Sequence, residues 1–274
     1  SAPVTGSPLV VTLANGQSIT IGVGESSGSV DFVAPNNVYN TNAPLTNSIT
    51  DISGGNYEKV EAVGKPSTTV TDGPGTQDST GLSVSATGEV TEGGKIVYTV
   101  SLTNPAGTEM KVTLSNNQVV TIAAGAKEGS ITVDAPADDV YNDGETLNVT
   151  ITGSTGGDFE SLVTSPDAAV TVVTDTIDTT TVTLSATPSV VEGGVVTYTA
   201  SVNAPVTGTP LVVTLSNGAT ITIPVGQTTA NSAAIPVRGD DAYAQGTQTL
   251  APVTITGTTG ANYEAVNTTG TINN

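Results

Sequence analysis

Residues Glu109–Ala123 read EMKVTLSNNQVVTIA. On either side of Asn116-Asn117, apolar side chains alternate with Lys, Thr and other polar residues. Alternation with a period of two is typical of a half-buried strand, and two asparagines between such runs indicate a two-residue hairpin turn. The stretch therefore predicts two antiparallel strands.

The same pattern extends over residues 79–178, where no segment keeps a helical period. Seven runs are expected to be strands: Leu82–Thr87, Lys95–Thr103, Glu109–Ser115, Gln118–Ala123, Glu128–Ala135, Thr146–Gly153 and Ala168–Thr174. Seven short strands in about 100 residues is the number in an immunoglobulin-like β-sandwich. We therefore expect an all-β fold.

The pattern recurs along the chain. Thr12-Leu13, Thr113-Leu114 and Thr214-Leu215 follow one another at intervals of 101 residues. The element at Gly54–Glu58 (GGNYE) returns at Gly156–Glu160 and Gly260–Glu264. A period this long indicates one autonomous domain per repeat. The expected domains are immunoglobulin-like sandwiches arranged end to end: residues 1–78, which lack the first two strands, 79–178 and 179–274.

Composition excludes several classes of function. The chain of 274 residues has 25 Asp and Glu against six Lys and Arg, a net charge of −19, and neither His nor Cys. Disulfides, zinc ligand sets and the usual nucleophile–base pairs are therefore absent. The negative charge disfavours nucleic acid and anionic membranes. No apolar run approaches the roughly 18 residues of a membrane span, so membrane insertion is not expected.

Acidic residues concentrate in the second repeat, which holds 14 of the 25. In a seven-stranded sandwich, the connections after the first and fifth strands and the end of the seventh strand share one pole. These segments carry Glu92, Asp138, Asp139, Asp143, Glu145, Asp175 and Asp178. We expect these carboxylates to converge.

Converging carboxylates repel one another and raise one another's pKa, so a stable cluster needs a cation. Calcium accepts six to eight oxygen ligands in flexible geometry, whereas magnesium demands a tighter arrangement. The sequence therefore predicts Ca²⁺ at this pole, with Gly260-Ala261-Asn262 of the next repeat close enough to lend a carbonyl. The equivalent candidate ligands elsewhere are Asp72, Asp78, Glu192, Asp240 and Asp241. The alternative is that these acids belong to ordinary solvated loops.

Tyrosines recur in the connection between the fifth and sixth strands, at Tyr39, Tyr141 and Tyr243. The expectation is a tyrosine-corner-like packing of each ring inside its own repeat.

Several motifs together resemble the extender repeats of giant bacterial RTX adhesins, the large type I-secreted adhesion proteins of Gram-negative bacteria. They are Glu92-Gly93-Gly94, the loop from Asp138 to Gly144, Gly156–Glu160 and Val173–Asp178. The acids are also arranged similarly to those of calcium-binding Calx-β domains. The resemblance implies a non-enzymatic spacer on the bacterial cell surface, a monomeric rod stiffened by calcium between neighbouring repeats. Such a spacer projects a ligand-binding tip for surface attachment or biofilm formation.

Three other functions remain open at this point. A module that binds a glycan or protein would use the connection between the second and third strands or that between the sixth and seventh, although these loops are poor in the aromatic residues that anchor ligands. A glycosidase would use paired carboxylates, but the close acid pairs all fall in the expected cation cluster. Strand donation into the incomplete first repeat would give polymers.

Overall fold

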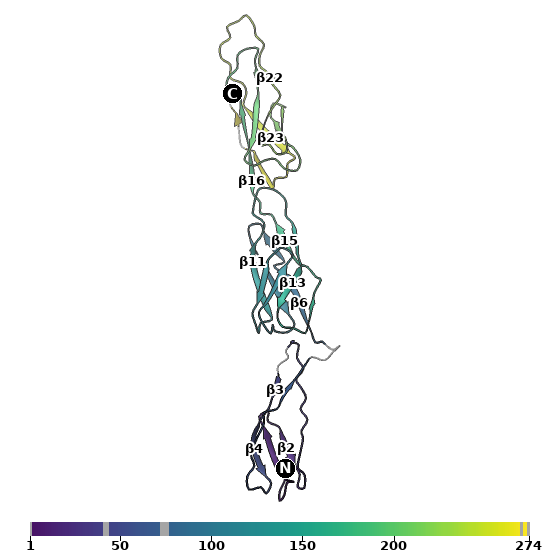
Figure 1. Cartoon of the computed structure of the whole chain (residues 1–274). Coiled ribbons are helices and arrows are strands. Elements are labelled where there is room, and N and C mark those ends of the chain that lie inside the picture. Colours follow the sequence, from purple (N-terminus) through teal and green to yellow (C-terminus); the bar gives the residue numbers. More distant parts are fainter. Residues whose placement is uncertain (1, 41–43, 72–76, 269–270, 273–274) are drawn as a thin grey trace. The chain divides into compact units, whose positions relative to one another are not determined.

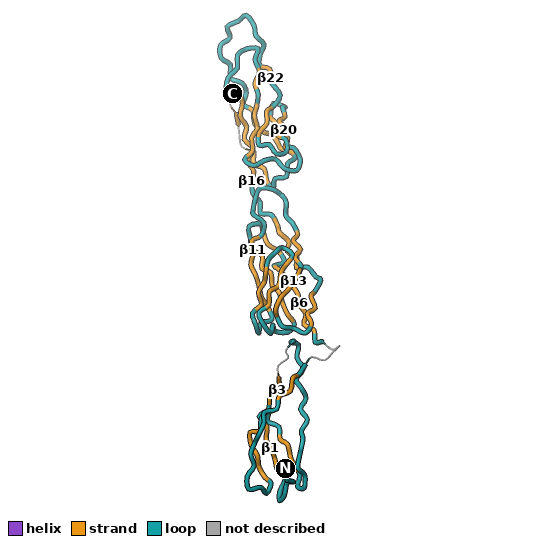
Figure 2. The backbone as a smooth tube through the Cα atoms, in the orientation of Figure 1, coloured by secondary structure: helices purple, strands orange, loops and turns teal. Residues whose placement is uncertain are grey.

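The computed structural model describes residues 2–40, 44–71, 77–268 and 271–272. All regular structure within these ranges is β-strand, so the expected all-β class is confirmed (Figure 2). Within the same ranges there is no helix long and apolar enough to cross a bilayer.

Contacts between Cα atoms divide the chain into two compact units. The first unit comprises Ser1–Ser85, Thr99–Ile131 and Thr150–Ala168, and the second comprises Ala86–Tyr98, Thr132–Val149 and Ala169–Asn274. The second sequence repeat thus contributes residues to both units, and the two units are described separately below.

Five strands of the first unit come from the first sequence repeat. They are β1 (Leu9–Leu13), β2 (Ser18–Ile21), β3 (Pro44–Thr46), β4 (Ile49–Gly54) and β5 (Ser67–Thr69). Strands β2, β1 and β4 form an antiparallel sheet, and β3 pairs with β5 (Figure 1). The buried core of this part is small and consists of Val4, Leu9 and Val11.

The second sequence repeat supplies ten strands. They are β6 (Ser79–Ala86), β7 (Glu89–Thr91), β8 (Lys95–Leu102), β9 (Met110–Leu114), β10 (Val119–Ile122), β11 (Glu128–Asp134), β12 (Thr146–Val149), β13 (Ile151–Gly156), β14 (Ser161–Thr164) and β15 (Ala169–Thr174). All seven expected runs are strands, and β7 and β14 were not expected. Both are only three or four residues long and pair in parallel, β7 with β15 and β14 with β6.

The sixth expected strand is two strands that have different partners. Strand β12 pairs with β15, whereas β13 pairs with β9 and shifts register between Ile151 and Gly153. A change of hydrogen-bonding partner leaves the alternation of side chains intact, so the sequence pattern does not reveal it.

The predicted two-residue turn at Asn116-Asn117 is a three-residue turn. Leu114 accepts a hydrogen bond from the N–H of Asn117 at 3.0 Å and donates its own N–H to Gln118 at 2.9 Å. Asn117 has a φ of 63°, the left-handed conformation that closes a type I turn followed by a bulge. Asparagine tolerates this conformation better than other residues with a side chain.

The third sequence repeat lies wholly in the second unit and forms a sandwich. Its strands are β16 (Thr179–Ala186), β17 (Val195–Val196), β18 (Tyr198–Val202), β19 (Leu211–Leu215), β20 (Thr220–Ile223), β21 (Thr229–Asn231), β22 (Ile235–Pro236), β23 (Val253–Thr259), β24 (Ala265–Thr268) and β25 (Thr271–Ile272). The sheet β21-β18-β16-β24 faces the sheet β20-β19-β23-β25, and β17 pairs with β22.

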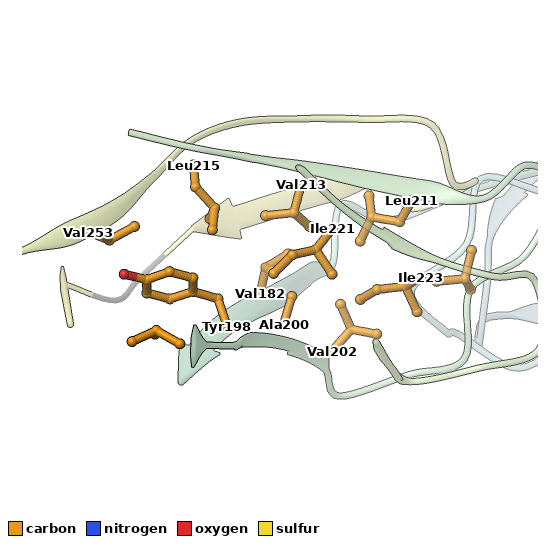
Figure 3. Close-up of a cluster of buried hydrophobic side chains, with 12 residues drawn as sticks. Val182, Tyr198, Ala200, Val202, Leu211, Val213, Leu215, Ile221, Ile223 and Val253 are labelled. Carbon is orange, nitrogen blue, oxygen red and sulfur yellow. The ribbon is translucent and has the colours of Figure 1, made fainter. Parts of the chain in front are cut away.

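The core of this sandwich comes from alternate residues of both sheets. Tyr198, Ala200 and Val202 of β18 point toward Leu211 and Val213 of β19 (Figure 3). Strand β19 shows a buried side chain at every second residue, as a strand with one apolar face requires. The alternation in the sequence is therefore sufficient to place these side chains inside.

Truncating this core should destabilise the third repeat. Leu211→Ala removes a side chain with no exposed surface, and such changes lower the free energy of unfolding by about 2–5 kcal/mol. Val225→Ala, at a side chain that is 51% exposed, is the matched control and should change it little. Urea unfolding followed by circular dichroism and tyrosine fluorescence measures both; equal effects would contradict the assignment of this core.

Candidate functional site

Three carboxylates from separate segments of the second unit meet in one place. Glu92 follows β7, Asp175 follows β15, and Glu264 precedes β24. One oxygen of each lies within 4.8 Å of the other two. Glu92 and Asp175 belong to the second sequence repeat and Glu264 to the third, so the cluster joins consecutive repeats.

Each of these carboxylates has a buried oxygen without a partner among the described residues. The atoms are Oε2 of Glu92, Oδ1 of Asp175 and Oε1 of Glu264. Glu92 is only 8% exposed, and burial raises the pKa of its carboxyl. The charges of Asp143, Asp175, Asp139 and Asp138 raise this pKa further. A buried, unpartnered carboxylate is destabilising unless a cation or donor compensates it.

Backbone hydrogen bonds hold the segments of the second repeat together at this site. The N–H of Glu92 donates to Thr174 O at 3.0 Å, and that of Gly93 donates to Pro136 O at 2.7 Å. A Cβ atom on Gly144 would lie 3.0 Å from Oδ1 of Asp175, so the glycine leaves room for the carboxylate. The expected convergence of these three segments is thus present.

The other acids expected at this pole have local roles. Asp138 accepts a hydrogen bond from the hydroxyl of Thr176, and Asp139 accepts the N–H of Tyr141 at 2.7 Å. Asp143 is the charge that acts most strongly on Glu92. The N–H of Asp178 donates to Oε2 of Glu264, whose other oxygen is the buried, unpartnered one.

Sequence reasoning missed Glu264. It anticipated a carbonyl from Gly260–Asn262, but the Asn262 carbonyl accepts the N–H of Asn142 at 3.0 Å. The missed signal was the glutamate that ends the recurring element, at Glu58, Glu160 and Glu264.

An aromatic bridge next to the cluster joins the second and third repeats. Tyr141 and Tyr263 form an antiparallel β-bridge, and their rings stack with centroids 5.6 Å apart. The hydroxyl of Tyr141 donates to Pro205 O at 2.7 Å. The N–H of Glu264 donates to Val140 O at 3.1 Å, so the bridge and the cluster share this glutamate.

The first unit contains the same bridge between the first and second repeats. Tyr39 pairs with Phe159, and their rings stack at 5.8 Å. The Tyr39 hydroxyl donates to Pro105 O at 2.8 Å, and the N–H of Glu160 donates to Val38 O at 3.0 Å. The ring stack and these two hydrogen bonds of the second bridge are therefore repeated, although Phe159 lacks the hydroxyl of Tyr263.

The tyrosine-corner interpretation of Tyr39 and Tyr141 was wrong. Both rings instead stack on an aromatic ring of the following repeat, Tyr39 on Phe159 and Tyr141 on Tyr263. A pattern within one repeat cannot show that the partner ring lies in the next one.

Beside the first bridge, the amides Asn36 and Asn37 occupy the positions that the carboxylates Asp138 and Asp139 occupy beside the second. The side chain of Asn36 donates to Asp78 at 2.8 Å, and the N–H of Asp78 donates to Glu160 at 2.9 Å. Asp72, another candidate ligand, lies outside the described residues.

In the third repeat, the equivalent of Glu92 is neutralised by an arginine. Glu192 pairs with Arg238, and the two side chains are 26% and 28% exposed. Asp241 accepts the N–H of Tyr243 and the amide of Gln245, and Asp240 lies beside Gly193. Among the described residues, Glu92, Asp175 and Glu264 form the one acidic group close enough to share an ion.

Comparisons with known proteins found one family. The model described as the LapA domain matches residues 2–73, 78–176 and 178–274. The solved structures include the crystal structure of a tetra-tandem repeat in the extending region of a large adhesion protein, 17% identical with a TM-score of 0.33. That match covers 93% of this chain, which spans 62% of the length of the other. No curated protein matches.

The aromatic bridge should protect its own backbone amides. Tyr141→Ala removes a ring stack and a hydrogen bond, each worth about 0.5–1.5 kcal/mol. The amides of Asn142 and Glu264 should then exchange with solvent at least about tenfold faster, as measured by NMR. Tyr243→Ala is the matched control, because its ring is 76% exposed. Unchanged exchange in Tyr141→Ala would show that the bridge does not hold the repeats together.

Proposed function

Because this chain belongs to the LapA domain family, we propose that it is a structural extender segment of a bacterial cell-surface adhesin whose junctions bind calcium. Its repeats would act as spacers that carry a ligand-binding tip away from the cell for attachment or biofilm formation. The proposal extends to the giant type I-secreted RTX adhesins, on the motifs that the sequence shares with their extender repeats. An extracellular location follows from the same role.

The proposed calcium site is based on the group of carboxylates formed by Glu92, Asp175 and Glu264. Each carboxylate has a buried oxygen without a partner among the described residues. One oxygen of each lies within 4.8 Å of the other two. Carboxylate oxygens are the ligands that Ca²⁺ prefers, and its flexible coordination tolerates ligands from three segments. Burial and then the repulsion of neighbouring carboxylates raise the pKa of Glu92, and a divalent cation here would offset both effects.

Calcium at this site would couple two repeats. Glu92 and Asp175 come from the second repeat and Glu264 from the third, so a shared ion would oppose rotation about the connection at Thr176–Asp178. In this proposal each repeat is its own domain, with the boundaries expected from the sequence at residues 78 and 178. The domains follow one another as a monomeric rod, and neighbouring repeats are its partners.

Calcium should raise thermal stability relative to EDTA. At about 100 times the dissociation constant, binding to the folded state alone adds about 2.7 kcal/mol. Asp175→Asn and Glu264→Gln preserve shape and remove one negative charge each, so both should abolish most of the calcium response in calorimetric melts. Glu264→Gln retains an oxygen that can accept the N–H of Asp178.

The control is Asp31→Asn, an exposed acid outside the cluster. Its calcium response should equal that of the unmodified chain. Melts that coincide in calcium and EDTA, or a loss in Asp31→Asn as large as in Asp175→Asn, would overturn the proposed site.

Small-angle scattering tests the stiffening. With calcium, the distribution of interatomic distances should be narrow and end at one maximum dimension. After chelation, repulsion between Asp175 and Glu264 should widen the range of junction angles and broaden the distribution. A scattering curve that chelation leaves unchanged would contradict a calcium-stiffened rod.

A further inference from the structure

The start and the end of the second repeat lie side by side and run in the same direction. Strand β6 pairs in parallel with β14 over four residues, beginning with Ser79 opposite Ser161. Strand β7 pairs in parallel with β15 over three residues, beginning with Glu89 opposite Val172. The paired residues of β6 and β14 lie in the first unit, and β7 and β15 lie in the second. Because the partners are distant in sequence, neither pair is closed by a turn.

Hydrogen bonds fasten β7 to β15 at both ends of the pair. The N–H of Val172 donates to Gly88 O, and the N–H of Glu92 donates to Thr174 O, each at 3.0 Å. The hydroxyl of Thr174 also donates to Val90 O at 3.4 Å. The last strand of the repeat is thus held directly to the segment that follows its first strand.

The pair of β6 and β14 is fastened in a similar way. The N–H of Ser165, which follows β14, donates to Leu82 O at 2.8 Å. Just before β6, the N–H of Asp78 donates to the carboxylate of Glu160 at 2.9 Å. The arrangement recurs at the start of the third repeat, where β16 pairs in parallel with β24. Parallel pairing of the first strand is therefore a property of the repeat.

A buried threonine adds a further bond between the last strand and the start of the repeat. Ala169, Thr171 and Val173 are the buried residues of β15, and Thr171 has no exposed surface. Its hydroxyl donates at 2.7 Å to the carbonyl of Thr87, in the short connection between β6 and β7. Burying a hydroxyl is unfavourable unless it is hydrogen-bonded, and a valine would fill nearly the same space. The threonine thus supplies a connection that an apolar side chain could not.

Tension along the chain loads β7 and β15 lengthwise. It reaches β7 through its first residue, Glu89, and β15 through its last, Thr174. Because the two strands run in the same direction, these pulls are opposed and tend to slide one strand past the other. Hydrogen bonds are evenly spaced along a parallel pair, so they share the load and have to break together. When the strands of a hairpin such as β9–β10 are pulled apart, the bonds break one after another instead.

We propose that β6–β14 and β7–β15 form a mechanical clamp that keeps the second repeat folded while tension acts along the chain. The tension itself follows from the proposed function, because an extender carries the load between a tip and the cell. The clamp consists of hydrogen bonds within one repeat and does not depend on calcium. All measurements are therefore made in EDTA, so that a failure of the clamp is distinct from a failure of the calcium site.

Single-molecule force spectroscopy of the whole chain tests the clamp, once the unfolding step of the second repeat is identified. Glu89→Cys/Val172→Cys serves this purpose, because both side chains are exposed and the chain has no cysteine of its own. Partner residues on neighbouring strands lie about 4.8 Å apart, within the range of a disulfide. Under oxidation the disulfide carries the tension past residues 90–171, so one unfolding step should disappear and return on reduction.

Two directions of pull then separate the clamp from ordinary stability. The second repeat should resist a higher force when the chain is pulled from its ends than when it is pulled through Lys111→Cys and Thr121→Cys. Lys111 and Thr121 are partners in the β9–β10 pair, so force between them parts that pair without loading β7 or β15. Equal unfolding forces in the two directions would overturn the proposal.

Substitution of Thr171 gives a second test. Loss of one hydrogen bond corresponds to about two- to tenfold faster unfolding, so Thr171→Val should unfold that much faster when the chain is pulled from its ends. Thr152→Val is the matched control, because the Thr152 hydroxyl donates to Thr113 O at 3.1 Å, between β13 and β9. This control should leave the unfolding rate under tension unchanged. An equal acceleration in both variants, or one in Thr171→Val that is the same in both directions of pull, would contradict the clamp.

Discussion

The antiparallel bridge between Tyr141 and Tyr263 is the contact on which the acidic site depends. It fixes the register between the second and third repeats, because Glu264 directly follows Tyr263 and donates its N–H to Val140. That register brings the Glu264 carboxylate within 4.8 Å of those of Glu92 and Asp175. Hydrophobic stacking and backbone hydrogen bonds therefore bring together charges that would otherwise separate.

The acidic side chains on these loops have different partners in each repeat, although the loops share the same backbone arrangement. In the second repeat the carboxylates of Glu92 and Asp175 lie close to that of Glu264, and each has a buried oxygen without a partner in the described part of the chain. In the third repeat, Arg238 supplies a fixed positive charge to Glu192. The residue equivalent to Arg238 in the second repeat is the uncharged Pro136, because Gly193 donates its N–H to Arg238 and Gly93 donates its N–H to Pro136. At the first bridge, an asparagine amide replaces a carboxylate. Within this framework, the side chains decide whether a junction requires an added cation.

Much of the site follows from the sequence by simple topology. Alternating strands place the segments of Glu92, Asp138–Asp143 and Asp175 at one pole, and the structure brings them together there. The third carboxylate could not be found in this way, since Glu264 belongs to another repeat. Glu264 reaches Glu92 and Asp175 only because the second and third repeats pack against each other. The alternation of residues within one strand carries no information about that packing. The tyrosine-corner interpretation of Tyr39 and Tyr141 failed for the same reason.

The sequence by itself determined the seven main strand segments of the second repeat, the repetition along the chain and the acidic pole. It did so because side-chain alternation and turn residues act locally, over a few neighbours along the chain. Only the tertiary structure decided that the strand expected at Thr146–Gly153 changes partner at Thr150, and that Glu192 meets Arg238. It also decided that Tyr39 and Tyr141 stack on rings of the following repeat. These features depend on contacts between residues distant in sequence, where close packing and charge pairing select one partner among many.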